Sequence, residues 1–166
     1  MKTVERSGVR WLWLSIIVII VDQLTKYWTV QALDLYQSYP VLSFFNFTYA
    51  RNYGAAFSFL DDSTLEWQKY LFSGIAVVVS LYLIYLLKKT SYLKRCRNIA
   101  FALIVAGAIG NVTDRLIFGF VIDFLDFDLG FYRWPTFNVA DISIFIGAAL
   151  IILESFLAKE DDKDSQ

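Results

Sequence analysis

Four long apolar runs decide what this chain can fold into. Crossing the hydrocarbon of a bilayer takes about 20 consecutive, mostly apolar residues as an α-helix. The composition agrees, since 57% of the residues are hydrophobic and the mean hydropathy is +0.50. We therefore predict a single membrane domain over residues 1–166, mainly α-helical, with four transmembrane helices. The predicted spans are residues 11–30, 69–87, 98–118 and 137–157.

Basic residues outside the spans predict the orientation of the chain. Lysine and arginine accumulate on the cytoplasmic side of membrane proteins, whereas acidic residues contribute little to this rule. Both termini and the loop between the second and third spans are therefore predicted to be cytoplasmic. The basic residues of these segments are Lys2, Arg6, Arg10, Lys88, Lys89, Lys94, Arg95, Arg97, Lys159 and Lys163.

The region between the first two spans, about residues 31–68, is too apolar for a simple solvated linker. Its SFFNFTYA stretch alternates aromatic and polar side chains, which is typical of short strands, and NYG indicates a turn. We expect a small β-containing subdomain on the outer surface of the bilayer. A loop packed on the helix ends is an alternative that fits the composition nearly as well.

Most ionisable and amide side chains inside or beside the spans fall on the predicted outer side. Such residues are rare in membranes and usually face a partner or a water-filled cavity, so the group predicts a functional site. Asp22 and Lys26 are four residues apart, which favours a structural ion pair, and Asp114 is interpreted as structural too. The group consists of Asp22, Lys26, Asn111, Asp114, Arg115, Asp123, Asn138 and Asp141.

Two further groups have a structural interpretation. Small residues in the third span predict close packing of helices. Asp126 and Asp128 are expected to be solvated loop residues. The small residues are Ala102, Ala106, Gly107 and Gly110.

The residue types that are absent exclude several chemistries. The chain has no histidine and one cysteine, Cys96, which excludes Ser-His and Cys-His nucleophile pairs and histidine-based zinc sites. We expect neither a metal nor a cofactor. The net charge of −1 and the lack of a basic stripe argue against nucleic-acid binding. A hydrolase with this sequence must use carboxylates for proton transfer.

Asp123 and Asp141 come from different segments, yet the predicted topology brings both to the same depth. Two carboxylates held close cannot both ionise readily, so one keeps a proton while the other is ionised. Such a pair can act as acid and base on one water, as aspartic peptide hydrolysis requires. By spacing alone, a cation or proton site is an open alternative.

Five short motifs, in order along nearly the whole chain, resemble the signature blocks of the lipoprotein signal peptidase family, also called signal peptidase II. They are DQLTK at 22–26, RNYGAAFS at 51–58, GNVTDR at 110–115, VIDF at 121–124 and FNVAD at 137–141. The resemblance implies an intramembrane aspartic endopeptidase of the bacterial inner membrane, with its active site toward the periplasm. Its substrates would be prolipoproteins that carry a diacylglyceryl group. Membrane lipids would surround it, and the cyclic peptide globomycin would inhibit it.

The resemblance also implies roles for individual residues. The aspartates of the fourth and fifth blocks form the catalytic pair of the family, which implies this role for Asp123 and Asp141. The aspartate of the first block serves stability more than chemistry, in agreement with a pairing of Asp22 and Lys26. The substrate site would contain Asn52, Gly54, Asn111, Arg115 and Asn138.

Two other classes of membrane protein compete with this interpretation. A small transporter or ion-conducting subunit would distribute its acids through the membrane and often carry inverted repeats, and no repeat is visible in the sequence. A purely structural membrane protein would leave the grouped polar residues without an explanation.

Overall fold

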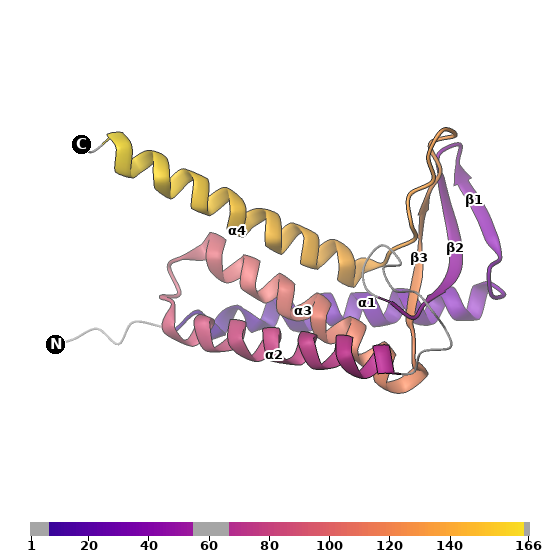
Figure 1. The fold of residues 1–166 in the computed structure, drawn as a ribbon, viewed down its shortest axis with the longest axis horizontal. Helices are drawn as coiled ribbons and strands as arrows, with labels where there is room; N and C mark the ends of the chain where they lie inside the picture. Colours follow the sequence, from indigo (N-terminus) through magenta and orange to yellow (C-terminus); the bar gives the residue numbers. More distant parts are fainter. Residues whose placement is uncertain (1–6, 55–66, 165–166) are drawn as a thin grey trace.

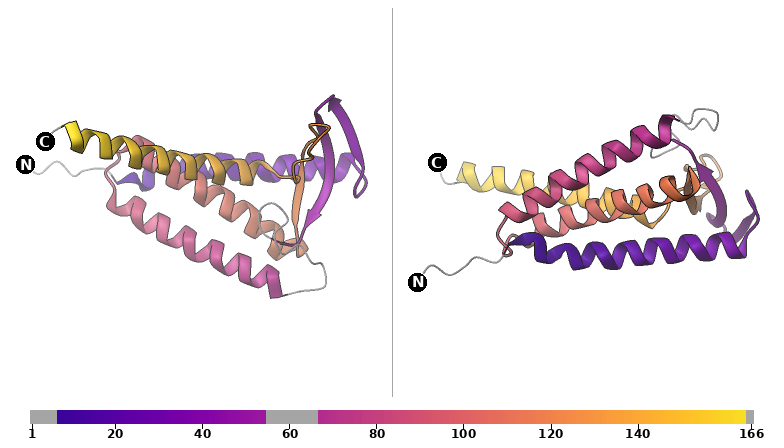
Figure 2. Two further views of the ribbon diagram at one scale, coloured as in Figure 1. Left: turned by 45° about the horizontal axis from the view of Figure 1, so that its top comes forward. Right: turned by 90° about the horizontal axis from the view of Figure 1, so that it is seen from below.

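The computed structural model describes residues 7–54 and 67–164, with side chains described up to residue 157. Within these ranges the chain forms four long helices and one three-stranded antiparallel sheet (Figure 1). The helices run along one common direction, and the sheet stands across one end of them (Figure 2). The predicted fold class, mainly α-helical with a small β-containing subdomain, is confirmed.

Each of the four helices corresponds to a predicted span. In the described part of the chain, each contains a stretch long and apolar enough to cross a membrane. The last one begins two residues later than predicted, because Asn138 caps it. The helices are α1 (Leu12–Ala32, after a 3-10 turn at Gly8–Trp11), α2 (Trp67–Lys89), α3 (Arg95–Phe118) and α4 (Val139–Asp164).

Helix α3 lies at the centre of the bundle, in contact with α1, α2 and α4. In its apolar stretch 61% of the residues are buried, against 22% or less in the other three spans. A Cβ atom on Gly107 would lie 2.2 Å from the carbonyl oxygen of Ala140, so α3 and α4 approach more closely than larger side chains allow. Close packing through Ala102, Ala106, Gly107 and Gly110, all of them buried, is thereby confirmed.

The two ends of the bundle differ in what they bury. An apolar cluster of Leu83, Leu87, Phe101 and Val105 lies where α2 ends and α3 begins. The buried charged side chains lie instead toward the sheet. Among the described residues these are Asp22, Lys26, Asp114, Arg115, Asp123 and Asp126.

The sheet consists of β1 (Ser38–Leu42), β2 (Phe45–Asn52) and β3 (Val121–Phe127), paired in that order. The first two strands confirm the predicted β structure of the outer region, of which residues 55–66 lie outside the described part. Strand β3 was not expected from the sequence. It follows α3 because Gly119 ends that helix with a φ of 85°, a left-handed conformation that glycine adopts without strain.

The prediction that Asp126 is a solvated loop residue is wrong, whereas Asp128 lies in the loop after β3 and is partly exposed. Asp126 lies on β3 and is fully buried, and it accepts hydrogen bonds from Thr48 Oγ1 at 2.7 Å and from Arg133. Asp128 is half-buried and forms a β-bridge with Arg133. The error arose because the pairing of β2 with β3, which covers Asp126, joins segments far apart in the sequence.

Replacing Asp126 by asparagine should lower the free energy of unfolding by about 1.5–3 kcal/mol, the usual contribution of hydrogen bonds to a charged group. The hydrogen bonds from Arg133 keep the pKa of Asp126 below its ordinary value of 3.8. This stabilisation is therefore present above about pH 4 and is lost as the pH falls through the folded-state pKa. Thermal unfolding in detergent measures both effects, with Asp128→Asn as the control. An unchanged melting temperature would contradict the prediction.

Candidate active site

Asp123 and Asp141 reach one site from two different elements. Asp123 lies on β3 and is 1% exposed, whereas Asp141 lies in the first turn of α4 and is half-buried. Asn138 connects them, since its Nδ2 donates to Asp123 Oδ1 at 2.7 Å and its backbone N–H donates to Asp141 Oδ2 at 3.3 Å. The structure thus brings together the two carboxylates that the predicted topology places at one depth.

Asn138 also starts helix α4. Its Oδ1 accepts a hydrogen bond from the backbone N–H of Asp141 at 2.9 Å, while its own N–H donates to the Asp141 carboxylate. This reciprocal pattern is a capping box, which satisfies two backbone donors that a helix end otherwise leaves unpaired. The carboxylate of Asp141 is thereby held in one orientation at a helix N-terminus, where the partial positive charge stabilises an anion.

Two more asparagines hold the aspartates from the other sides. Asn52, the last residue of β2, donates from Nδ2 to Asp123 Oδ2 at 3.1 Å. Asn111, from α3, donates from Nδ2 to Asp141 Oδ1 at 2.8 Å and accepts at Oδ1 from Asn138 Nδ2 at 3.2 Å. These amides fix the carboxylates without adding charge to the site.

Arg115 joins α3 to the end of β2. Its Nη2 donates to the carbonyl oxygen of Gly54 at 2.6 Å, and the backbone N–H of Gly54 donates to Asn52 Oδ1 at 3.0 Å. The buried Nε of Arg115 has no hydrogen-bond partner among the described residues. The residues predicted for the substrate site, Asn52, Gly54, Asn111, Arg115 and Asn138, therefore surround the two aspartates. The rest of the second motif, residues 55–58, lies outside the described residues.

Burial sets the protonation of Asp123. The loss of solvation and the nearby negative charge of Asp141 outweigh the hydrogen bonds from Asn52 and Asn138, and they raise the pKa of Asp123 to about 8. At neutral pH Asp123 therefore keeps its proton, while the Asp141 carboxylate accepts hydrogen bonds from Asn111 Nδ2 and from the backbone N–H of Asn138. One acid and one base beside each other can transfer protons to and from a single reacting group.

Asp22, Lys26 and Asp114 form a buried ion cluster next to this pair. Lys26 Nζ lies 2.8 Å from Asp22 Oδ2 and 2.8 Å from Asp114 Oδ2. The ion pair expected from the spacing of Asp22 and Lys26 is present, and Asp114 joins it from α3. Gln23 was missed in the sequence, although it donates to Asp114 Oδ1 at 2.9 Å. Its position within DQLTK, beside Asp22, is a signal that could have identified it.

An apolar pocket opens beside Asp141, between α4 and the sheet. Its volume is about 440 Å³. The sequence contained no signal for this pocket, because aromatic residues near a membrane surface also serve as interfacial anchors. The other lining residues are Phe127, Leu129, Trp134, Phe137, Ile142 and Phe145.

The sequence matches one protein family over most of its length. The family model described as Signal peptidase (SPase) II matches residues 14–157. A protein from Psychromonas ingrahamii named lipoprotein signal peptidase is 66% identical over 159 residues, which are 96% of this chain and 91% of that protein. A protein with the same name from Alteromonas mediterranea is 50% identical over 100% of this chain and 90% of that protein. Another from Haemophilus ducreyi is 49% identical over 96% of this chain and 99% of that protein.

The fold matches solved structures of bacterial membrane enzymes. One of them, determined by the in meso method at 2.3 Å resolution, has a TM-score of 0.82 and 32% sequence identity, and the match covers 92% of this chain and 90% of that chain. A second, at 1.9 Å resolution, has a TM-score of 0.75 and 34% sequence identity, and the match covers 87% of this chain and 91% of that chain.

Proposed function

The chain belongs to the signal peptidase II family, and from this premise we propose that it is an aspartic endopeptidase that removes the signal peptide from prolipoproteins. One observation carries the aspartic mechanism. Asp123 and Asp141 share Asn138 as a hydrogen-bond partner, and one of them is buried enough to keep its proton at neutral pH.

Each aspartate has its own part in the hydrolysis. Asp141, ionised, takes a proton from a water whose oxygen attacks the carbonyl carbon of the scissile peptide bond. Asp123, protonated, donates a hydrogen bond to the carbonyl oxygen as negative charge develops there, and its proton then goes to the leaving nitrogen. The buried Nε of Arg115 and the amides of Asn52 and Asn111 are donors that would position the peptide.

The substrate is proposed to be a prolipoprotein that carries a diacylglyceryl group. The apolar pocket beside Asp141 supports this, because it would accept part of an acyl chain while the peptide bond lies at the two aspartates. A substrate anchored by lipid is held near the bilayer surface, which is the depth that the topology predicts for this pair. Membrane lipids are its neighbours, and globomycin is expected to compete for the same site.

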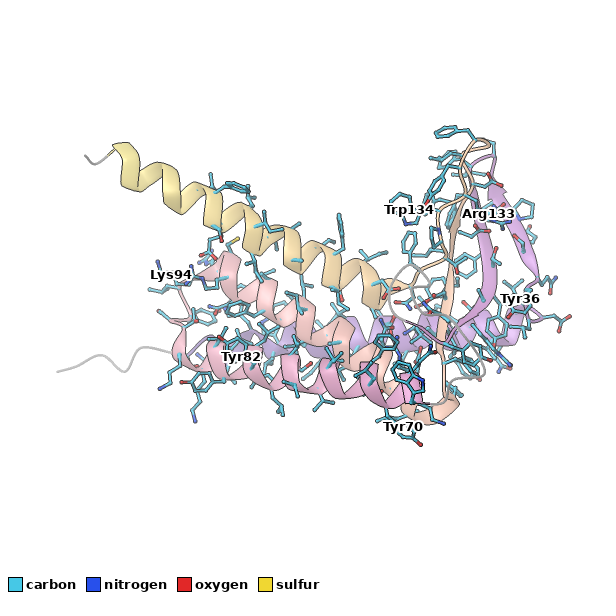
Figure 3. All side chains as sticks on the ribbon, viewed as in Figure 1. Tyr36, Tyr70, Tyr82, Lys94, Arg133 and Trp134 are labelled. Carbon is cyan, nitrogen blue, oxygen red and sulfur yellow. The ribbon has the colours of Figure 1, made fainter. Side chains whose placement is uncertain are left out.

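The enzyme is a multi-pass membrane protein, and we propose that it lies in the bacterial inner membrane with its active site toward the periplasm. Lys88 and Lys89 end α2 and Arg95 begins α3, at the end of the bundle opposite the sheet. Figure 3 shows Lys94 at that end, whereas Trp134 and Arg133 lie on the sheet side. By the positive-inside rule, the end with Lys94 and both termini is cytoplasmic.

The assay uses purified enzyme in detergent and a prolipoprotein with and without the diacylglyceryl group. A shift in gel mobility reports release of the signal peptide. Cleavage of the modified precursor and not of the unmodified one is the expected result. Equal cleavage of both precursors would contradict the lipid specificity, and cleavage of neither would contradict the proposed activity.

The rate of cleavage should fall above about pH 8. Because the pKa of Asp123 is raised to about 8, this residue loses its proton above that pH and can no longer act as the acid. The pH profile of kcat/KM measures the effect. A profile that stays flat to about pH 10 would contradict the assignment of Asp123 as the acid.

Introducing a charge into the pocket should weaken binding of the lipid group. Leu129→Glu is expected to raise KM for the modified precursor about tenfold, since one buried apolar side chain contributes about 1.5 kcal/mol or more. Leu42→Glu is the control, because Leu42 does not line the pocket and has a similar exposed fraction, 53% against 48% for Leu129. Equal KM values for the two variants would contradict a role of the pocket in lipid binding.

A further inference from the structure

We propose that Lys26, Asp22 and Asp114, here called the Lys26 cluster, are positioning residues that hold the two catalytic aspartates in register through the backbone. This inference rests on the proposed roles of Asp123 and Asp141. The cluster belongs to α1 and α3, whereas the aspartates belong to β3 and α4.

Each carboxylate of the cluster binds the backbone amide that precedes one catalytic aspartate. Asp114 Oδ2 accepts a hydrogen bond from the N–H of Ile122 at 3.1 Å. Asp22 Oδ1 accepts one from the N–H of Ala140 at 2.9 Å. The residues that directly precede Asp123 and Asp141 are therefore each held by one anion.

Lys26 connects the two anchors. An ammonium group has three N–H donors, and all three have acceptors at Lys26. Two are the carboxylates of Asp22 and Asp114, both at 2.8 Å, and the third is Asn111 Oδ1 at 3.1 Å. Since Asn111 in turn donates to Asp141, the cation also orients a side chain that touches the pair.

Helix α4 shows why such an anchor is needed. The first amides of a helix have no partner within the helix. Asn138 caps the amide of Asp141, and Asp22 caps that of Ala140 from a different helix. The first turn of α4 is thereby fixed to α1 as well as closed on itself, so Asp141 cannot shift along the helix axis without breaking an ionic hydrogen bond.

Stability alone does not account for this cluster. Replacing buried ion pairs by apolar side chains of similar volume is often neutral or stabilising, and apolar side chains would suit the interior of a membrane bundle. Apolar side chains could not accept hydrogen bonds from the backbone amides of Ile122 and Ala140. Misplacement of reacting groups by about 1 Å costs about 100-fold in rate, so the geometry that the cluster enforces has a direct effect on catalysis.

The test separates kcat from KM. Lys26→Met keeps the length of the side chain and removes all three donors. Measured per folded molecule, kcat should fall by about 100-fold and KM should change less than kcat does, because the cluster holds both aspartates and reaches the substrate site only through Asn111. Glu154→Gln is the control, since it removes the ion pair with Arg97 Nε, at 3.0 Å, near the opposite end of the bundle. A kcat for Lys26→Met within about tenfold of the parent enzyme would overturn the proposal.

A second pair of variants decides the question if Lys26→Met does not fold. Asp114→Asn keeps an oxygen that can accept from Ile122, whereas Asp114→Ala does not. Both remove the charge, so a purely electrostatic or structural role predicts the same kcat per folded molecule for the two. The proposal predicts that the kcat of Asp114→Asn is at least about tenfold higher than that of Asp114→Ala. Equal kcat values for the two variants would overturn it. Full activity of Asp123→Asn would instead refute the catalytic pair itself.

Discussion

Asp123→Asn and Asp141→Asn are each expected to lower kcat for prolipoprotein cleavage by about 100-fold to 10,000-fold, the contribution of one positioned general acid or base. The two variants fail for opposite reasons. An amide at position 123 would have no acidic proton for the leaving nitrogen, and an amide at position 141 could not accept a proton from water. Asp34→Asn is the control, because Asp34 is an exposed carboxylate outside the site.

The loss of activity should occur without loss of folding. An acid whose folded-state pKa is raised is destabilising above its ordinary pKa, since the unfolded chain releases a proton that the folded chain keeps. The parent therefore loses stability as the pH rises from about 4 toward the value of about 8 that Asp123 has in the fold. Asparagine removes this effect, so Asp123→Asn should melt no lower than the parent at neutral pH.

Thermal unfolding followed by tryptophan fluorescence checks that expectation, in parallel with the gel assay. An inactive variant with a parental melting temperature supports the proposed chemistry. A variant that keeps more than about a tenth of the parental kcat would remove that aspartate from the mechanism.

The four spans could be predicted because length and apolarity alone decide whether a helix can cross a membrane. The common depth of Asp123 and Asp141 followed from the same topology. Their connection through Asn138 could not be predicted in detail, since it needs a capping box that starts α4 two residues later than the apolar run suggests.

Strand β3 shows where sequence patterns fail. VIDFLDF looks like an apolar run with two acids in it, and its conformation depends on a partner strand far away in the chain. The same pairing buries Asp126, which was predicted from the sequence to be solvated. The hydrogen bonds from the backbone amides of Ile122 and Ala140 could not be predicted either. Their acceptors lie on α3 and α1, and no local sequence pattern marks a backbone group.

Gly107→Ala tests how closely the proposed catalytic residues depend on the contact between α3 and α4. The added Cβ would lie 2.2 Å from the Ala140 carbonyl oxygen and 2.6 Å from Ser143 Oγ. A backbone atom at that distance cannot turn away as a side chain can, so α4 has to move. Overpacking of this kind costs about 1–3 kcal/mol, and thermal unfolding in detergent should show a clearly lower melting temperature.

Gly74→Ala is the matched control, since it makes the same change inside helix α2 and its Cβ would meet no atom of the described residues within 4 Å. Alanine favours a helix over glycine by about 1 kcal/mol, so this variant should be at least as stable as the parent. The movement of α4 also predicts a loss of kcat for Gly107→Ala alone, because Ala140 directly precedes Asp141. If the two variants had the same melting temperature and the same kcat, the added methyl group would fit between α3 and α4. The placement of Asp141 would then not depend on their close approach.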